Sequence, residues 1–394
     1  MNHKLSDLIL SIEPSSTVGI ADKVKHLREQ GQTVYDFSAG RAFEPTPAYI
    51  VDVAHQAMRS GDTHQTMARG TTPFRQAVAE KLKRENGISA NPDTEIITTM
   101  GVKQGMTLAL LTLINEGDEV IVEDPCFVSY KQLIKVPGGV PVTVPLRKDN
   151  RFRWDPDELE AAITPRTRAI IFNSPHNPTG VVHTQEDLQV IADLAQKHGL
   201  YVISDEVYER IVWKGHKHQN LANLPGMRPW TITLTSLTKS FAMGGWRIGF
   251  AHADAGLIEK MVTIQAHLLT SCNAFVQTAA ATAFANPAPP EVTAIWDTWY
   301  QKTQRITQAL DAMEGLSCQM PEGAFYAWFD ITALGISSLE FTERLLEQEK
   351  VALVHGSSFG EFGEGYIRMT CVKTDDELNH GLEGISRFLK TLTS

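Results

Sequence analysis

The residues best suited to chemistry gather in four short segments in the middle of the chain. Between them, the segments supply an amide, a carboxylate, a phenol, an amine and a guanidinium. They are Asn173–Gly180 (NSPHNPTG), Ser204–Tyr208 (SDEVY), Ser236–Lys239 (SLTK) and Gly244–Arg247 (GGWR). A lysine amine can bond to a carbonyl carbon and then carry protons, and a guanidinium can hold an anion by a two-point contact. The set indicates a catalytic site that binds a ligand.

We expect each segment to lie just past the carboxyl end of a buried strand. The apolar runs with strand character are Glu95–Thr99, Glu119–Val122, Ala169–Phe172, Leu200–Ser204, Trp230–Leu234 and Arg247–Phe250. Helical patterns separate these runs, among them 101–115 and 184–198; the second opens on Thr184 and stops at Gly199. Strands that are apolar on both faces and separated by helices predict a largely parallel sheet covered on both sides. Such a sheet binds ligands beyond the carboxyl ends of its strands.

The pattern changes after a proline-rich break at 287–290. A long helix carrying Trp296 follows, and a last helix spans about Asp375–Leu392. Between them the sequence predicts strand Ala324–Phe329, helix 338–349 and strands near Val351–Val354 and Tyr366–Met369. This order is typical of a smaller α+β unit. We therefore expect a large domain at 48–288 and a small domain formed by 1–47 and 289–394.

Composition narrows the class of protein. The chain has 394 residues, which at roughly 100–200 residues per domain suggests about two or three structural units. Its 46 acidic residues outnumber its 36 basic ones, for a net charge of −10. A nucleic-acid binder would normally present a basic face, so we expect no nucleic-acid partner.

The cysteines, histidines and apolar stretches bear on metals and membranes. Four widely spaced cysteines without a CxxC pair predict a reducing, cytoplasmic location. His216 and His218 lie in a polar loop without a nearby cysteine, so we expect no metal site. Residues 261–290 contain no charged side chain, but Gln265 and other polar residues favour a buried helix over a membrane span.

Taken in order, these motifs resemble those of one enzyme family. The sequence is similar to fold-type I pyridoxal-phosphate (PLP) enzymes, specifically class I/II aminotransferases of the aspartate aminotransferase family, from about Pro14 to the last helix. The most specific matches are HNPTG, SDEVY, and SLTKSF followed by GWRIG. Asp205 follows Asn177 by 28 residues, and Arg247 follows Lys239 by 8, which are the spacings of the family. The resemblance implies an α/β fold with a mostly parallel seven-stranded sheet between helices, plus the smaller α+β domain.

The resemblance assigns the cofactor-binding positions one by one. Lys239 matches the lysine that holds the PLP aldehyde, and Asp205 matches the carboxylate that keeps the pyridine nitrogen protonated. Tyr208 and Asn177 match the residues that hydrogen-bond the ring oxygen, and Phe127 matches a ring stacked on the pyridine. The matches to phosphate ligands are Gly101, Val102, Lys103, Ser236 and Arg247, where backbone N–H groups and positive charge suit a phosphate.

The resemblance also implies the substrate contacts and a homodimer. Arg368 matches the arginine that clamps the α-carboxylate, and Gly40 and Asn177 match residues close to the same group. The residues that resemble side-chain ligands of a second carboxylate are Ser16, Thr17 and Lys103, with Arg41 added near the substrate mouth. They favour aspartate or glutamate as donor and 2-oxoglutarate as co-substrate. Gln65 falls where many relatives place a tyrosine that reaches the PLP phosphate of the neighbouring subunit.

Two departures from the family pattern keep alternatives open. The loop Gly40–Phe43 lacks the usual proline and carries Arg41, and Gln65 replaces the tyrosine. We predict an aminotransferase that moves the α-amino group of an L-amino acid to a 2-oxo acid by a ping-pong mechanism. The alternative on the same scaffold is a PLP-dependent lyase, decarboxylase or cyclase. A PLP-binding regulator and an idle structural protein are two further alternatives; the first would need a DNA-reading module, and no helix-turn-helix is present before the domain.

Overall fold

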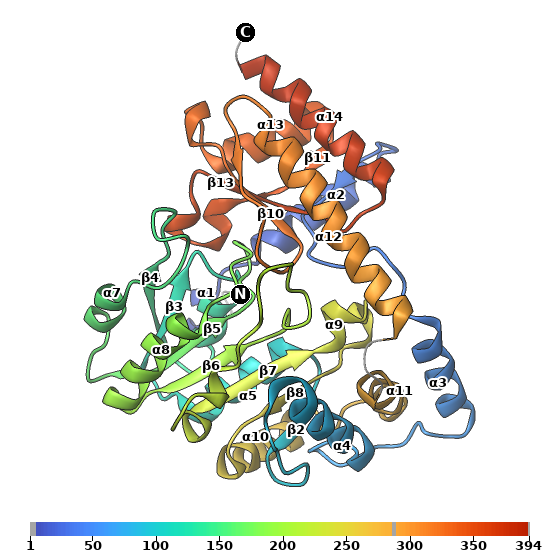
Figure 1. Cartoon of the computed structure of the whole chain (residues 1–394), viewed down its shortest axis with the longest axis vertical. Helices are drawn as coiled ribbons and strands as arrows, with labels where there is room; N and C mark the ends of the chain where they lie inside the picture. The colour runs from blue at the N-terminus through green and yellow to red at the C-terminus, as the bar shows by residue number, and fades with distance from the viewer. Residues whose placement is uncertain (1–4, 286–288, 393–394) are drawn as a thin grey trace.

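A computed structural model describes residues 5–285 and 289–392 of the chain. Its main feature is a seven-stranded sheet in the order β2-β8-β7-β6-β5-β3-β4 (Figure 1). The strands are β2 (Ile96–Thr99), β3 (Glu119–Asp124), β4 (Val140–Pro145), β5 (Thr167–Asn173), β6 (Tyr201–Asp205), β7 (Thr231–Ser236) and β8 (Gly249–His252). Only β8 runs against its neighbours. The predicted mostly parallel, seven-stranded sheet is confirmed.

Alternation of apolar side chains along the strands explains the layers. In β3, Val120 and Val122 join one apolar cluster and Ile121 joins another on the opposite face. The first cluster includes side chains of α5 (Val102–Leu113), α6 (Tyr130–Lys135) and α10 (Ala255–Leu268). The second includes α7 (Pro156–Ala161) and α8 (Gln185–His198). Both faces of the sheet are therefore covered by helices, which is why its strands read as continuous apolar runs.

Most predicted element boundaries hold to within about two residues. Thr184 caps α8 in a capping box with Asp187, and Gly199 ends it at a φ of +67°, because glycine adopts this left-handed conformation without strain. The predicted strand start at Arg247 is wrong. Arg247 has a φ of +55°, so β8 begins only at Gly249.

Residues 261–285 of the uncharged stretch form parts of two helices rather than one, and residues 286–288 lie outside the described residues. After α10 the chain turns through 269–273 and continues as α11 (Ala274–Ala285). Val276, Ala279 and Ala283 of α11 are buried against α3 (Ala48–Arg59) and α4 (Thr72–Lys81), so the stretch is apolar because it is interior. Within the described residues, no helix is long and apolar enough to cross a membrane.

The C-terminal part builds a second, antiparallel sheet. Its strand order is β12 (Val354–His355), β13 (Tyr366–Thr370), β10 (Tyr326–Asp330) and β9 (Ser317–Cys318). Side chains of α12 (Pro290–Asp311), α13 (Ser338–Glu349) and α14 (Asp375–Leu392) pack on it in one cluster. Near the N-terminus, β1 (Tyr35–Asp36) pairs with β11 (Val351–Ala352). The smaller α+β unit is thus confirmed, and the N-terminal segment joins it.

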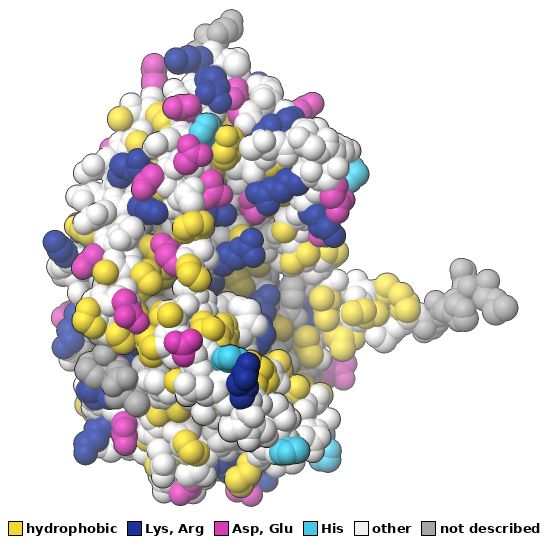
Figure 2. Space-filling view, turned by 90° about the vertical axis from the view of Figure 1, so that its right-hand side faces the viewer, with side chains coloured by type: hydrophobic (Ala, Val, Ile, Leu, Met, Phe, Trp, Pro, Cys, Tyr) yellow, Lys and Arg dark blue, Asp and Glu magenta, His cyan; other side chains and the backbone are white. Residues whose placement is uncertain are grey.

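The N-terminal helices had no clear signal in the sequence. They are α1 (Asp7–Ser11) and α2 (Ser16–Glu29). Leu8, Ile9 and Leu10 of α1 are all exposed, and Figure 2 shows an arm bearing apolar side chains that projects from the body of the molecule. Because α1 buries none of its residues, its apolar side chains are largely exposed to solvent.

One carboxylate ties the large sheet to the C-terminal part. Asp124, at the end of β3, accepts the backbone N–H groups of Phe362 (3.0 Å) and Glu361 (3.2 Å) and pairs with Lys131 (2.8 Å). The close approach requires a glycine next to them. Gly360 has a φ of +140°, and an added Cβ would collide with the Asp124 carboxylate.

Gly360→Ala should destabilise the protein by roughly 2–4 kcal/mol, from backbone strain and from the displaced Asp124 contacts. The control is Gly19→Ala in α2, where an added Cβ meets nothing within 4 Å and helix propensity should raise stability slightly. Urea unfolding of both variants tests this. Equal midpoints for Gly360→Ala and wild type would contradict the inferred contact.

Candidate active site

A cavity of about 310 Å³ opens where three strands of the large sheet end. Asn173, Asp205 and Ser236 close β5, β6 and β7 and line its floor, and residues of the C-terminal part face them. The cavity brings together twelve of the predicted site residues: Thr17, Gly40, Val102, Lys103, Phe127, Asn177, Asp205, Tyr208, Ser236, Lys239, Arg247 and Arg368.

Backbone contacts between neighbouring strand ends position the floor. Asn173 and Asp205 are register partners. The Asn173 amide donates to the Asp205 carbonyl (2.8 Å) and accepts the N–H of Asn177 (2.8 Å), which fixes the loop after β5. Ser236 caps the short helix α9 (Leu237–Ser240) by accepting the N–H of Thr238. Lys239 therefore sits three residues beyond the end of β7.

Asp205 is a buried carboxylate with strong donors. Its Oδ2 accepts the hydroxyl of Tyr130 at 2.7 Å, and its Oδ1 accepts the N–H of Val207 at 3.1 Å. Burial raises the pKa of Asp205 to about 6, although the hydrogen bonds from Tyr130 and Val207 and the charge of Lys239 act in the opposite direction. A cation placed against this carboxylate would stabilise its ionised form.

The Lys239 amine lies between the sheet and the N-terminal loop. It donates a hydrogen bond to the carbonyl of Gly40 and lies 5.7 Å from the centre of the Tyr208 ring. A Cβ at Gly40 would collide with the hydroxyl of Tyr326. The loop can approach the amine this closely only because position 40 is a glycine.

One end of the cavity is positively charged. Gly101, at a φ of +80°, precedes α5, and a Cβ there would lie 2.9 Å from Nη2 of Arg247. Arg247 donates to the carbonyls of Gly244 (3.0 Å) and Met100 (3.1 Å). Partial burial and the charges of Arg247 and Lys239 lower the pKa of Lys103. A helix start with two cations beside it suits a phosphate.

Arg368 marks the other end. It is 3% exposed, lies in β13, and donates to Asn177 Oδ1 (2.9 Å) and the Ser38 carbonyl (2.8 Å). Its Nε has no hydrogen-bond partner. No carboxylate of the described residues lies within ion-pair distance of Arg368. Burial lowers the pKa of this guanidinium, yet arginine remains charged at neutral pH. A buried cation without an anion favours an anionic ligand.

Four predicted residues lie outside the cavity lining. Gly101 directly precedes the lining residue Val102. Ser16 begins α2 next to the lining residue Thr17. Arg41 and Gln65 are exposed, and neither lines the cavity. Gln65 is predicted to act on a neighbouring subunit, which a single chain does not test.

Several lining residues had no assigned role in the sequence. They are Ser38, Ala39, Met106, Tyr130, Leu133, Asn173, Val207, Thr238 and Tyr326. Tyr326 lies in an apolar strand and resembles plain core. Tyr130 lies 75 residues before its partner Asp205, so only folding brings the two together.

The fold and this cavity define a class of protein. A mostly parallel sheet that carries an acid and a lysine at its strand ends, between two cationic ends of one cavity, is the architecture of a fold-type I PLP-dependent transferase. The family model described as "Aminotransferase class I and II" matches residues 32–385. The chain belongs to the class I and II aminotransferase family, and it is a PLP-dependent aminotransferase.

Relatives and solved structures agree with this assignment. The chain is 38% identical to aromatic-amino-acid aminotransferase 2 of Thermococcus litoralis and 37% identical to aspartate aminotransferase of Pyrococcus abyssi, over 98% of each chain in both cases. Aspartate aminotransferase from Thermus thermophilus with maleate superposes with a TM-score of 0.92 at 34% identity, covering 98% of this chain and 99% of that one. The aromatic aminotransferase from Pyrococcus horikoshii OT3 gives 0.89 at 38% identity, covering 94% and 99%.

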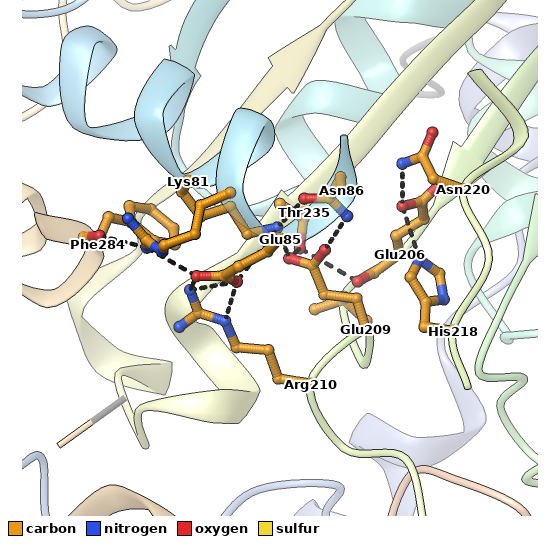
Figure 3. A network of polar contacts seen from close by, with 12 residues as sticks. Lys81, Glu85, Asn86, Glu206, Glu209, Arg210, His218, Asn220, Thr235 and Phe284 are labelled. Carbon is orange, nitrogen blue, oxygen red and sulfur yellow. Dashed lines mark hydrogen bonds and ion pairs between the residues drawn. The ribbon is translucent and has the colours of Figure 1, made fainter. Parts of the chain in front are cut away.

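A polar network supports the strand ends from outside the cavity (Figure 3). Glu206 accepts hydrogen bonds from Ser204 (2.8 Å) and Asn220 (2.7 Å) and contacts His218 (2.9 Å). Glu209 pairs with the fully buried Lys81 of α4. Since Glu206 follows Asp205 and Glu209 follows Tyr208, the network holds both cavity residues through the backbone.

The same network bears on the metal question. Ligand atoms of Glu206, Glu209 and His218 lie within 4.8 Å of one another, a spacing compatible with a metal ion. However, Glu209 already has the ammonium of Lys81 and the amide of Asn86 (2.9 Å) as partners. The Lys81 ammonium supplies the positive charge beside Glu209, and the carboxylate oxygens of Glu206 and Glu209 already accept hydrogen bonds from protein groups.

Glu209→Gln should destabilise the protein by about 1–3 kcal/mol near pH 7, because the buried Lys81 would lose its nearest carboxylate and keep only Asn86 (2.7 Å) and the more distant Glu85 (4.0 Å) as partners. Burial alone would raise the pKa of Glu209, but Lys81, His218 and Arg210 outweigh it and lower the pKa from 4.5 to about 2. The stability due to ionised Glu209 is therefore complete above pH 4.5 and is lost as the pH falls towards 2. Denaturant unfolding from pH 7 to pH 3 should show a shrinking difference between variant and wild type. A constant difference over this range would contradict the pairing.

Proposed function

We propose that this cavity binds PLP covalently at Lys239 and transfers the α-amino group of an L-amino acid to a 2-oxo acid in a ping-pong cycle. The observation that carries the proposal is Arg368, a buried guanidinium in the same cavity as the Lys239 amine. Its Nε–H has no hydrogen-bond acceptor and its charge has no carboxylate partner among the described residues. An amino acid or a 2-oxo acid would supply the missing carboxylate in a two-point contact.

The other side chains fit the cofactor group by group. The N–H groups of Gly101 and Val102, with Lys103, Ser236 and Arg247, would hold the phosphate. Asp205 would pair with the pyridine nitrogen, whose positive charge offsets the cost of a buried carboxylate. Tyr208 and Asn177 would hydrogen-bond the ring oxygen, and Phe127 would stack on the ring. Bound there, PLP supplies an aldehyde that bonds to amines and a ring that withdraws electrons from the substrate α-carbon.

The protein's own residues then perform the proton chemistry. Arg368, with Asn177 at 2.9 Å, fixes the substrate carboxylate and so orients the Cα–H bond. Lys239, with its amine free, would take the proton from that carbon as a general base. The Gly40 carbonyl, which accepts a hydrogen bond from the Lys239 amine, would orient that amine. The second half of the cycle uses the same groups in reverse order.

The donor is proposed from the lining. Thr17 and Lys103 line the cavity, and Ser16 is adjacent, which favours a second carboxylate and hence aspartate or glutamate with 2-oxoglutarate. Arg41, exposed on the N-terminal loop, would add positive charge near the cavity mouth. Leu133 also lines the cavity and is compatible with an aromatic side chain, so both substrate classes belong in the assay.

The assembly is proposed from exposed surfaces. We propose a homodimer in which Gln65 contacts the cofactor phosphate of the neighbouring subunit. The exposed apolar side chains of α1 support this, because a second copy could cover them. We propose two domains at 48–288 and at 1–47 with 289–394; the boundary at 288 lies outside the described residues. The four cysteines are free and buried, which is compatible with the cytoplasm.

The purified, PLP-loaded enzyme should convert to the pyridoxamine form when mixed with its amino-acid donor, and 2-oxoglutarate should restore the original spectrum. Lys239→Ala should lose the lysine-linked absorbance and nearly all activity, since no other lysine amine lies at the centre of the cavity. The measurement is a half-reaction screen by absorbance across acidic, aromatic and aliphatic amino acids. Consumption of an amino acid without formation of the pyridoxamine form would favour a lyase, decarboxylase or cyclase.

Arg368→Gln should lower kcat/KM for donor and acceptor by a factor of roughly 30 to several thousand, corresponding to about 2–5 kcal/mol for loss of a buried charge contact. PLP affinity should change little, because the residue lies at the far end from the proposed phosphate site. Arg344→Gln, whose ion pair with Glu340 is on the surface of α13, is the control. Steady-state kinetics of both variants measure this change. An unchanged kcat/KM in Arg368→Gln would contradict the proposed contact between Arg368 and the substrate carboxylate.

A further inference from the structure

Tyr326 is a cavity residue that no motif singled out. It begins β10, is 1% exposed, and contacts both functional ends of the site. Its hydroxyl lies 2.7 Å from the hydroxyl of Tyr208, and the centre of its ring lies 4.5 Å from the Arg368 guanidinium. One side chain thus touches the proposed ligand of the cofactor ring oxygen and the proposed substrate clamp.

The direction of the hydrogen bond between the two phenols matters once the cofactor is bound, because each hydroxyl can donate only one proton. Each hydroxyl has one proton, and within the described residues each is the only hydrogen-bond partner of the other. If Tyr208 donated to Tyr326, it would have no proton for the cofactor ring oxygen. If Tyr326 donates, the proton of Tyr208 is free for that oxygen.

Burial keeps the hydroxyl of Tyr208 protonated. Burial, Tyr326 and its hydrogen bond raise the pKa of Tyr208 well above 10, with Arg368 acting in the opposite direction. Tyr208 is therefore a neutral hydrogen-bond donor at physiological pH. The orientation of its O–H bond decides which acceptor receives its proton. A fixed donor behind it sets that orientation.

Tyr326 is itself fixed from two sides. Gly40 approaches its hydroxyl so closely that a Cβ would collide with it. The guanidinium of Arg368 lies over its ring, and the same guanidinium is held by the Ser38 carbonyl (2.8 Å). The hydroxyl consequently has little freedom to turn away from Tyr208.

We propose that Tyr326 is a positioning residue that donates its hydroxyl proton to Tyr208 and thereby directs the Tyr208 proton to the ring oxygen of PLP. The inference rests on the proposed function of the site. The aromatic ring of Tyr326 has a separate role, because it packs on the Arg368 guanidinium. Replacing the hydroxyl alone should therefore alter the cofactor and leave carboxylate binding intact.

The test is a double-mutant cycle with Tyr326→Phe and Tyr208→Phe, read by the pH midpoint of the absorbance change of the cofactor–lysine linkage. A donor to the ring oxygen stabilises the deprotonated form of that linkage, so losing the donor raises the midpoint. Tyr326→Phe should raise it by a few tenths to about one pH unit. In the Tyr208→Phe background, Tyr326→Phe should cause no further shift. The kcat of the Tyr326→Phe single variant should fall. Its KM should stay within about twofold of wild type, because phenylalanine keeps the ring over Arg368.

Tyr130→Phe is the matched control. It removes another buried cavity hydroxyl, but one that donates to Asp205, so its effect should persist in the Tyr208→Phe background. A Tyr326→Phe midpoint equal to wild type, or a shift of equal size with and without Tyr208, overturns the inference. If Tyr208→Phe alone leaves the midpoint unchanged, the proposed role of Tyr208 fails instead, which is a distinguishable result. Thermal unfolding of each cofactor-free variant verifies that all of them fold.

Discussion

The site depends on the imbalance of charge in one partly buried cavity. Lys103, Lys239, Arg247 and Arg368 line it, and Asp205 is the only carboxylate among the lining residues. Water solvates such charges poorly once they are buried, and no carboxylate of the described residues compensates Arg368. A ligand with a phosphate at one end and a carboxylate at the other would restore the balance. The excess of positive charge in the cavity therefore favours a ligand that is anionic at both ends.

The remainder of the structure serves to keep those charges in place. The sheet delivers Asp205 and Lys239 to one edge because β6 and β7 are parallel neighbours. The C-terminal part delivers Arg368 from the opposite side through β13. Asp124 couples the two halves at the end of β3. Arg368 thus lies in the C-terminal sheet, whereas Lys239 lies in the helix α9 that follows β7 of the large sheet. A change in how the two sheets pack would change the distance between the two residues.

The departures from the family pattern lie at the rim. Arg41 and Gln65 are exposed and outside the cavity lining, whereas the residues that face Lys239 match the family. Gly40, the only member of the altered loop that lines the cavity, is still a glycine, and its contact with Tyr326 explains why. The variation thus lies at exposed positions, whereas the predicted residues that line the cavity match the family pattern.

The sequence by itself determined the strands, most helices and the main site residues. Buried parallel strands are apolar throughout, so the polar runs HNPTG and SDEVY that follow them stand out in the sequence. Tertiary structure alone decided the contacts between distant segments. Tyr130 reaches Asp205, and Tyr326 reaches Tyr208 across 118 residues. In an apolar strand such as β10, the sequence does not distinguish a tyrosine with a functional hydroxyl from an ordinary core residue. Burial favours aromatic residues whether or not their hydroxyl has a partner, so the partner is identified only by tertiary packing.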